Sequence, residues 1–305
     1  MEQACGLRLT GLMLALPSYI NRVYELRAVD GTKLIVKFYR PGRWSRDAIL
    51  DEHAFVADCA RSEVPVVAPL TLANGSTLGE NDGVLFALYP KRAGRQFEIT
   101  SDEDRVRVGS LVARMHLAGE TVLAPHRVII GPRESAKNDL AYLCESVVPS
   151  RFREGYRDAG MRLIEASTPL FEGLERIRIH GDCHCGNILN RLDEGLLLID
   201  FDDMAVGPPV QDLWLLLPDR AAKSAREAEL FLQGYERFRR FDRASVRCIE
   251  PLRAMRMIYF LAWVSRQSND ILFKRNFPDW GSDSFWQREI NDLREQLEFV
   301  RQQNE

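Results

Sequence analysis

The chain has 305 residues, which is enough for a sizeable hydrophobic core in one large domain or two smaller ones. Hydrophobic residues make up 46% of the chain and charged residues 28%, the composition of an ordinary soluble globular protein. Its 41 basic and 44 acidic side chains nearly balance, so the sequence lacks the positive charge with which proteins attract nucleic acids or anionic membranes. We therefore expect neither nucleic acid nor a membrane as a partner.

The cysteines are scattered along the chain, and none of them forms the C-x-x-C spacing of zinc or redox sites. Cys183 and Cys185 flank His184, but ligands so close together on one short loop rarely form a tetrahedral zinc site. Scattered thiols in a chain of this length are typical of a reducing compartment. The longest apolar stretch, residues 257–264, is too short to span a membrane. We therefore predict a cytoplasmic protein.

The first third of the chain has the pattern of a small antiparallel sheet with one helix. Residues 22–26 and 33–39 are rich in strand-forming side chains and flank Asp30-Gly31, a pair that favours a hairpin because both residues tolerate positive φ. An amphipathic helix and two further strands are predicted at residues 47–61, 64–72 and 84–89.

Beyond residue 100 the pattern is mainly helical. Pro90 to Gly94 breaks the strand pattern and is predicted to link two lobes. Helices are expected at residues 102–116, 137–147, 156–164, 211–217, 223–238, 249–266 and 284–302. The sequence thus predicts an α+β fold with a small antiparallel β-rich N-terminal lobe, residues 1–93, and a larger helical C-terminal lobe, residues 94–305.

A short β-rich segment, residues 177–203, interrupts these helices and carries the most informative pattern. It contains His-Gly-Asp-x-His-x-x-Asn and ends in Ile-Asp-Phe-Asp-Asp after an apolar run. Asp182 follows one short strand, and Asn187 leads into a second. An Asp-Glu-Gly turn then reverses the chain, so that a third strand delivers Asp200 at its end. We expect this hairpin to bring Asn187 and Asp200 close together, with Asp182 beside them.

These three side chains suit the transfer of a phosphoryl group. Asn187 and Asp200 offer the oxygen ligands that Mg²⁺ prefers, and Asp182 can orient a hydroxyl group and take its proton late in the transfer. The spacing from Asp182 to Asn187 is that of the protein-kinase catalytic loop H-R-D-x-x-x-x-N, and Asp200 corresponds to the metal-binding Asp of D-F-G. Taken singly, Asp182 could be a turn residue and Asn187 a loop cap.

Four other polar residues of this segment have milder interpretations. His180 and His184 are expected to be structural, packed under the loop and bonded to backbone groups, and catalysis by either is the less favoured alternative. Asp202 and Asp203 are expected to support the metal ligands from behind or simply to face water.

A lysine for the nucleotide phosphates is expected on a strand of the N-terminal lobe. Lys37, in Ile-Val-Lys-Phe, fits the V-A-I-K pattern, in which a buried strand directs one ammonium group at the phosphates. The alternative is an ordinary lysine at a sheet edge. The acidic partner of Lys37 should come from the next helix, where Glu52 reaches farther than Asp51.

The segment before the first predicted strand differs from a protein kinase. Residues 16–23 contain no glycine, although a glycine-rich loop covers the phosphates in protein kinases. Phosphate contacts would therefore come from Ser18, Asn21 and backbone N–H groups.

Together these motifs resemble the aminoglycoside phosphotransferase and choline kinase superfamily. More narrowly, the chain resembles the bacterial stress response kinase A family of serine/threonine protein kinases, in which a glycine-free phosphate loop is usual. The matching stretches extend from about Pro17 to Trp286 and include residues 18–24, 36–41, 51–55, 94–98, 180–189, 207–214 and 250–256.

The resemblance implies a bilobal protein-kinase-like fold, with nucleotide binding in the N-terminal lobe and catalysis and substrate binding in the C-terminal lobe. It implies ATP as co-substrate, Mg²⁺ as cofactor and Asp182 as proton acceptor. It places Asp182 and Asp200 at the reacting centre, assigns Mg²⁺ to Asn187 and Asp200, and extends the nucleotide site to Ser18, Lys37 and Glu52.

Three functions remain open at this point. The first is a monomeric serine/threonine kinase that phosphorylates proteins and itself, and the family resemblance favours it. The second is a kinase for a small alcohol such as choline, homoserine or an aminoglycoside, and the third is a nucleotide-binding regulator without activity. Trp263, Trp280 and Trp286 could form an aromatic cage for a cationic small substrate, but ordinary packing in the helical lobe is the favoured interpretation.

Overall fold

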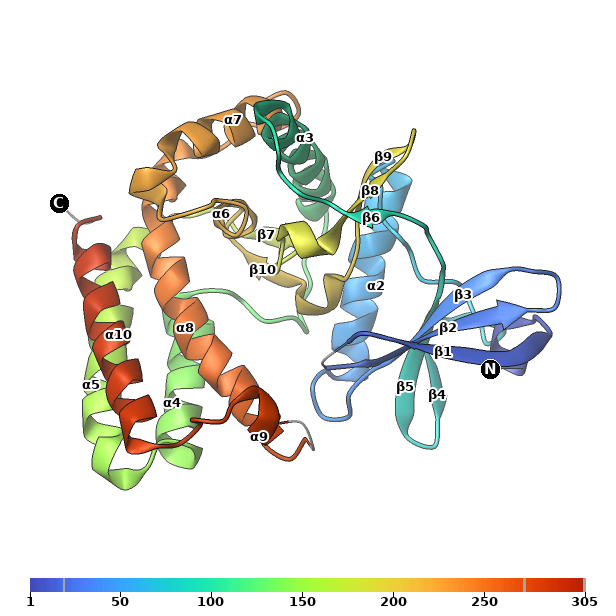
Figure 1. Ribbon diagram of the computed structural model, residues 1–305. Coiled ribbons are helices and arrows are strands. Elements are labelled where there is room, and N and C mark those ends of the chain that lie inside the picture. Colours follow the sequence, from blue (N-terminus) through green and yellow to red (C-terminus); the bar gives the residue numbers. More distant parts are fainter. Residues whose placement is uncertain (19, 271–272, 304–305) are drawn as a thin grey trace. The chain divides into compact units, whose positions relative to one another are not determined.

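Contacts between residues divide the chain into two compact units, and each is described by itself. The computed structural model describes residues 1–18, 20–270 and 273–303 (Figure 1). Unit 1 combines residues 1–127, 177–206 and 226–241, and unit 2 combines residues 128–176, 207–225 and 242–305. The mixture of an antiparallel sheet with many helices confirms the predicted α+β class.

A five-stranded antiparallel sheet forms the first part of unit 1. Its order is β1-β2-β3-β5-β4, with bounds β1 Leu9–Leu16, β2 Arg22–Ala28, β3 Lys33–Phe38, β4 Gly79–Asn81 and β5 Val84–Pro90 (Figure 1). The predicted hairpin is confirmed, because the Asp30-Gly31 turn joins β2 to β3 with Gly31 at φ 88°. Lys37 lies in the middle of the sheet, between Val23 of β2 and Ala87 of β5.

Strand β1 at the edge of this sheet is missing from the sequence prediction. The apolar side chains of Leu12, Met13 and Leu14 follow one another and are all largely exposed, so the strand lacks the alternation by which half-buried strands are recognised. A short helix, α1 Glu2–Cys5, precedes it and is also unpredicted.

Residues 64–72 do not form the predicted strand, which is a correction. Their backbone is irregular apart from an isolated bridge between Val66 and Leu198. Two prolines in this stretch cannot donate hydrogen bonds to a ladder, although Val64 and Leu72 are buried. The apolar residues therefore fill the core without pairing as a strand.

The helix that follows β3 places an acidic side chain inside unit 1. Helix α2 spans Arg46–Arg61, and the Ser45 hydroxyl accepts a hydrogen bond from a backbone N–H of its first turn. Glu52 lies on the buried face of α2 and is 2% exposed. The helix predicted at residues 47–61 is confirmed.

Two helices far apart in the sequence touch backbone to backbone in unit 1. Helix α3 spans Asp102–Gly119, and helix α7 spans Ala225–Tyr235. A Cβ atom on Gly109 of α3 would lie 2.0 Å from the carbonyl oxygen of Phe231 in α7. Only glycine permits this approach, so the contact holds residues 226–241 against the rest of unit 1.

Short strands frame the segment with the kinase-like motifs. Strand β7 pairs with β10, and β6, β8 and β9 form an antiparallel sheet, with bounds β6 Arg95–Gln96, β7 Ile177–Ile179, β8 Ile188–Arg191, β9 Gly195–Leu198 and β10 Ala205–Gly207. The predicted hairpin is formed by β8 and β9, and Asp193 and Gly195 in its turn have φ values of 63° and 86°.

Unit 2 is built mainly of helices. They are α4 Lys137–Ser146, α5 Ser150–Ser167, α6 Val210–Trp214, α8 Ile249–Ser265, α9 Phe273–Asn276 and α10 Asp283–Arg301 (Figure 1). The predicted helices of this unit are confirmed, although α5 begins earlier and ends later than the predicted 156–164. Within the part of the chain that the structure describes, no helix is both long and apolar enough to cross a membrane.

The tryptophans considered for a cage are packing residues in unit 2. Trp286 is only 1% exposed, and its ring lies edge-on to Tyr156 at 5.8 Å and 6.0 Å from Trp280. Trp263 stacks on Phe260. A buried indole such as Trp286 has no open face for a cation, so the structure supports the packing interpretation.

Candidate active site

The loop that carries Asp182 is held against the Ile-Asp-Phe-Asp-Asp segment. His180 is fully buried, its Nε2 lies 2.9 Å from the carbonyl oxygen of Ile199, and its ring packs on Phe201 at 4.6 Å. Gly181 has a φ of 82°, and a Cβ atom there would lie 2.1 Å from the carbonyl oxygen of Asp203. This close approach requires glycine at position 181. His180 is packed under the loop and bonded to a backbone group, as expected.

Hydrogen bonds connect the predicted metal ligand Asn187 to Asp182 and to the residue that precedes Asp200. The Asn187 side-chain nitrogen donates to the carbonyl oxygen of Asp182 at 2.9 Å and lies 3.5 Å from its Oδ2. The backbone N–H of Ile199 donates to the carbonyl oxygen of Asn187 at 3.0 Å, which continues the β8–β9 ladder. Asp200 therefore directly follows Ile199, the residue that pairs with Asn187, as we expected from the predicted hairpin.

Asp200 has an unusual backbone for a residue other than glycine. Its φ of 59° and ψ of 68° lie in the left-handed region, which costs about 1 kcal/mol or more for such a residue. The conformation ends the extended chain after β9 and begins a 3-10 turn, Phe201–Asp203. About half of the Asp200 side chain is exposed, and its Oδ1 lies 3.3 Å from Lys37 Nζ.

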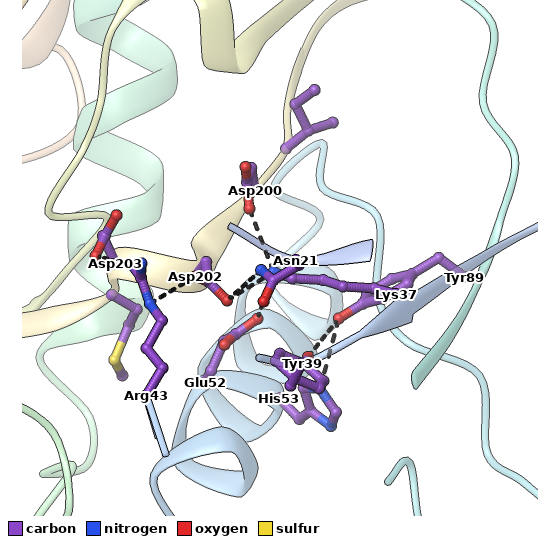
Figure 2. A network of polar contacts seen from close by, with 12 residues as sticks. Asn21, Lys37, Tyr39, Arg43, Glu52, His53, Tyr89, Asp200, Asp202 and Asp203 are labelled. Carbon is purple, nitrogen blue, oxygen red and sulfur yellow. Dashed lines mark hydrogen bonds and ion pairs between the residues drawn. The ribbon is translucent and has the colours of Figure 1, made fainter. Parts of the chain in front are cut away.

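Lys37 is surrounded by three carboxylates (Figure 2). Its Nζ lies 2.9 Å from Asp202 Oδ1, 3.3 Å from Asp200 Oδ1 and 3.9 Å from Glu52 Oε1. Burial by itself would lower the pKa of Lys37, but Asp202, Asp200 and Glu52 outweigh it and raise the pKa well above its usual value. Lys37 is therefore a buried cation, and the predicted partner Glu52 is the most distant of its acids.

Asp202 is the nearest acidic partner of Lys37, and the sequence did not reveal this pairing. It is 6% exposed, so of its two expected roles the one in which it simply faces water is wrong, and the supporting role stays a prediction. Its Oδ1 also accepts from Asn21 Nδ2 at 3.1 Å, and its Oδ2 lies 3.2 Å from Arg43 Nε (Figure 2). Although burial acts to raise the pKa of Asp202, the charges of Lys37 and Arg43 lower it to about 2.

Two arginines complete the setting of Asp202 and Asp203. Arg43 donates to Asp203 Oδ1 at 2.7 Å as well as pairing with Asp202 (Figure 2). Arg127 donates to the carbonyl oxygens of Asp202 and Met204 at 2.5 and 2.7 Å. Neither arginine belongs to a recognisable motif, and only the row of acids after Asp200 signals that cations must lie nearby.

Glu52 carries less charge than the predicted ion pair with Lys37 requires. Burial raises the pKa of its carboxyl group to about 7, against the opposing attraction of Lys37. Its Oε2 lies 3.9 Å from Arg127 and, among the described residues, has no hydrogen-bond partner.

The residue after Glu52, His53, is also buried and lies beside Tyr39 (Figure 2). His53 Nε2 is 2.9 Å from the Tyr39 hydroxyl, and His53 Nδ1 is 2.8 Å from the Thr77 hydroxyl. Tyr89 joins the group through a 3.1 Å contact between the two tyrosine hydroxyls. Burial, with Lys37 adding to it, lowers the pKa of His53 to about 3, so the ring is neutral.

The turn between β1 and β2 holds the residues expected at the phosphates. Ser18 is exposed there, as a phosphate contact would require. Asn21 is buried, with its Oδ1 accepting from the backbone N–H of Arg40 at 3.1 Å and its Nδ2 bonded to Asp202. The Asn21 side chain therefore ties the turn to the protein, and its geometry gives no support to a phosphate contact.

Comparison with known proteins agrees with this geometry. Residues 14–249 match the model of the phosphotransferase enzyme family. The chain belongs to this family. It is 39% identical to stress response kinase A of Escherichia coli (strain K12) over 306 residues, which cover 97% of this chain and 90% of that protein. It is 38% identical over 304 residues to the serine/threonine protein kinase RdoA of Salmonella typhimurium (strain LT2), with the same coverage. The chain is therefore a kinase, a phosphotransferase that acts on a hydroxyl group.

A solved kinase structure shares this fold. Amicoumacin kinase hAmiN, in complex with AMP-PNP, Ca²⁺ and Ami, superimposes with a TM-score of 0.76 at 18% identity. The match covers 96% of this chain and 91% of that one. It confirms the expected kinase-like fold.

The donor set at Asn187 and Asp200 can be tested for its fit to a metal. Among the described residues, no group of three or more His, Cys, Asp or Glu side chains is placed to hold an ion. Mg²⁺ is usually held by one or two protein oxygens together with substrate phosphates and water. Asn187 uses its nitrogen to bond Asp182, which leaves its oxygen as the ligand atom, and the Asp200 carboxylate is half exposed. The residues fit a metal that arrives with a nucleotide.

Proposed function

We propose that this chain is an ATP- and Mg²⁺-dependent serine/threonine protein kinase of the stress response kinase A type, which transfers the γ-phosphate of ATP to protein hydroxyls and to its own. The observation that carries the proposal is the placement of Asp182, Asn187 and Asp200: Asn187 bonds Asp182, and Asp200 follows Ile199, whose N–H donates to the carbonyl oxygen of Asn187. The kinase names of the relatives support the reaction, and one of them names a serine/threonine protein kinase.

Nucleotide binding is assigned to unit 1. Asn187 and Asp200 would hold Mg²⁺, which supplies positive charge to the phosphate oxygens during transfer. Lys37 would point at the phosphates, with Glu52 behind it and Ser18 on the turn between β1 and β2. The AMP-PNP and Ca²⁺ in the amicoumacin kinase complex support a nucleotide and a divalent metal in this fold.

The transfer step assigns one proton to Asp182. The oxygen of the acceptor hydroxyl forms a bond to the γ-phosphorus of ATP, the bond from that phosphorus to the β–γ bridging oxygen breaks, and ADP leaves with its electron pair. The hydroxyl proton passes to the Asp182 carboxylate. Its side chain is 22% exposed, so a hydroxyl group can approach it from solvent.

The remaining expectations belong to the same proposal. A boundary near residue 93 between a nucleotide-binding lobe and a catalytic lobe stays a prediction, as does a monomer. In the described chain all six cysteines are free thiols, which supports a reducing, cytoplasmic setting.

Incubation with radiolabelled ATP and Mg²⁺ tests the function. We expect label on the kinase itself and on a generic protein acceptor such as casein, and none without Mg²⁺. Asp182→Asn is the matched inactive control. ATP turnover that requires choline, homoserine or an aminoglycoside, with no label on protein, would replace the protein-kinase proposal by a small-molecule kinase. No turnover with any acceptor would favour a nucleotide-binding regulator.

A further inference from the structure

His184 is oriented by the backbone two residues along the chain. Its Nδ1 accepts a hydrogen bond from the Gly186 N–H at 3.0 Å, so it caps the short 3-10 turn Cys185–Asn187. A nitrogen that accepts carries no proton, and the proton of a neutral imidazole must then lie on the other nitrogen. In this arrangement His184 is neutral and Nε2 is a donor.

That donor faces the carboxylate assigned as the proton acceptor. His184 Nε2 lies 3.3 Å from Asp182 Oδ2, and Asn187 Nδ2 approaches the same oxygen at 3.5 Å. Two donors from one short loop thus converge on a single oxygen. Because a carboxylate is planar, fixing Oδ2 also fixes the direction of the other oxygen of Asp182.

Gly186 provides the space that this arrangement needs. A Cβ atom at position 186 would lie 2.7 Å from His184 Cε1 and 2.8 Å from Nδ1, which is closer than real contacts allow. The backbone of Gly186 is not in the left-handed region, so its own conformation does not require glycine. The absent side chain instead allows the imidazole ring to lie over residue 186.

We propose that His184 is a positioning residue, which holds Asp182 in the orientation needed to accept the hydroxyl proton. The proposal rests on the proposed function of Asp182. It revises the expectation that His184 is only structural, because a purely structural cap would use Nδ1 and leave the direction of Nε2 without consequence.

His184→Asn separates the two roles. Asparagine is a good cap, so it keeps an acceptor for the Gly186 N–H, but its short side chain does not reach Asp182. We expect kcat to fall about 10-fold or more, as for other small losses of alignment, while the KM for ATP and the melting temperature stay unchanged. His126→Asn, at a half-exposed histidine elsewhere in unit 1, is the matched control.

Gly186→Ala tests the same geometry with the imidazole still present. The new methyl group would displace the ring, so this variant should lose kcat as His184→Asn does. It also keeps the test decisive if His184→Asn fails to fold.

A double mutant shows whether His184 acts through Asp182. In an Asp182→Asn background, adding His184→Asn should lower the residual rate no further. Additive losses, a wild-type kcat in His184→Asn, or a raised KM for ATP with unchanged kcat would each overturn the inference. Failure of the role proposed for Asp182 looks different, because Asp182→Asn by itself would then retain the wild-type rate, and failure of the protein-kinase proposal would appear as label on a small alcohol instead of protein.

Discussion

Unit 1 contains two groups of charged side chains that differ in exposure. The Lys37 cluster, made of Lys37, Asp202, Arg43 and Glu52, is mostly buried, whereas the Asp182 loop, residues 180–187, carries a partly exposed carboxylate. Lys37 and Asp202 are each less than a tenth exposed and neutralise one another inside the protein, with Arg43 adding a second cation. Asp182 is 22% exposed, and its contact His184 is 41% exposed. Buried charges require partners, whereas a carboxylate that exchanges a proton with a substrate requires access. The cluster thus holds its charged side chains in fixed positions, whereas the loop orients the Asp182 carboxylate and leaves it accessible to solvent.

The largest expected effect is a loss of kcat when Asp182, the partly exposed carboxylate of this comparison, is replaced. Asp182→Asn keeps the size of the side chain but removes the proposed proton acceptor, so kcat should fall by about 10²- to 10⁴-fold. The affinity for ATP, measured by calorimetry, and the melting temperature should stay near the wild-type values, because the residue is partly exposed and lies outside the Lys37 cluster.

Asp200→Ala is the contrasting variant for this measurement. It removes a proposed metal ligand, so ATP binding in the presence of Mg²⁺ should be lost together with activity. An Asp200→Ala enzyme with full activity would place the metal elsewhere, and an Asp182→Asn enzyme with unchanged kcat would remove Asp182 from the mechanism.

The next effect probes which acid holds Lys37. Asp202→Asn leaves buried Lys37 without its nearest carboxylate and weakens the pairing of Arg43, so it should lower the free energy of unfolding by about 3–5 kcal/mol. Glu52→Gln should cost less, because Glu52 lies 3.9 Å from Lys37 and its pKa is about 7. Urea unfolding at pH 7 measures both. A larger loss in Glu52→Gln than in Asp202→Asn would restore Glu52 as the main partner.

The smallest expected effect is a dependence of the free energy of unfolding on pH, caused by His53 and Glu52. The pKa of His53 is about 3 in the folded protein and about 6.5 when unfolded, so the unfolded chain binds the proton first as pH falls. The stability due to neutral His53 is present above pH 6.5 and is lost toward pH 3, at roughly 1 kcal/mol per pH unit. Glu52 acts in the opposite sense, because its raised pKa gives stability below pH 4.5 that is lost as pH rises to 7.

His53→Gln separates these two contributions. Between about pH 4.5 and 6.5 they oppose one another in the wild type, whereas the variant keeps only that of Glu52. The advantage of the wild type over His53→Gln should therefore shrink as pH falls from 6.5 to 4.5. Urea unfolding across this range checks it, and a constant difference would mean that His53 takes up protons in the folded state.

Much of the fold could be predicted because local signals agree with it. Apolar periodicity marks α2, α3, α8 and α10, and the Asp-Gly pair marks the β2–β3 hairpin. The failures have physical causes. Edge strand β1 lacks alternation, and residues 64–72 are apolar because they are buried, not because they pair.

The candidate site divides in the same way. Asp182, Asn187 and Asp200 are predictable because they share one motif of fixed spacing. The partners of Asp202 are not, because Asn21, Arg43 and Arg127 lie far from it in the sequence and meet it only after folding. His184 was visible in the motif, but its direction depends on a hydrogen bond to Gly186 that no spacing reveals.

The scattered origin of unit 1 has a consequence for its synthesis. The unit draws on three stretches of chain, the last of which ends at residue 241. A ribosome adds roughly 5–20 residues per second, so Lys37 emerges on the order of 10 s before Asp202. During that delay the nascent sheet holds a cation whose nearest counter-ion has not yet been made. The candidate site is thus completed late in translation, and a nascent chain that stops at residue 127 contains Lys37 and Glu52 but none of the residues proposed for metal binding or proton transfer.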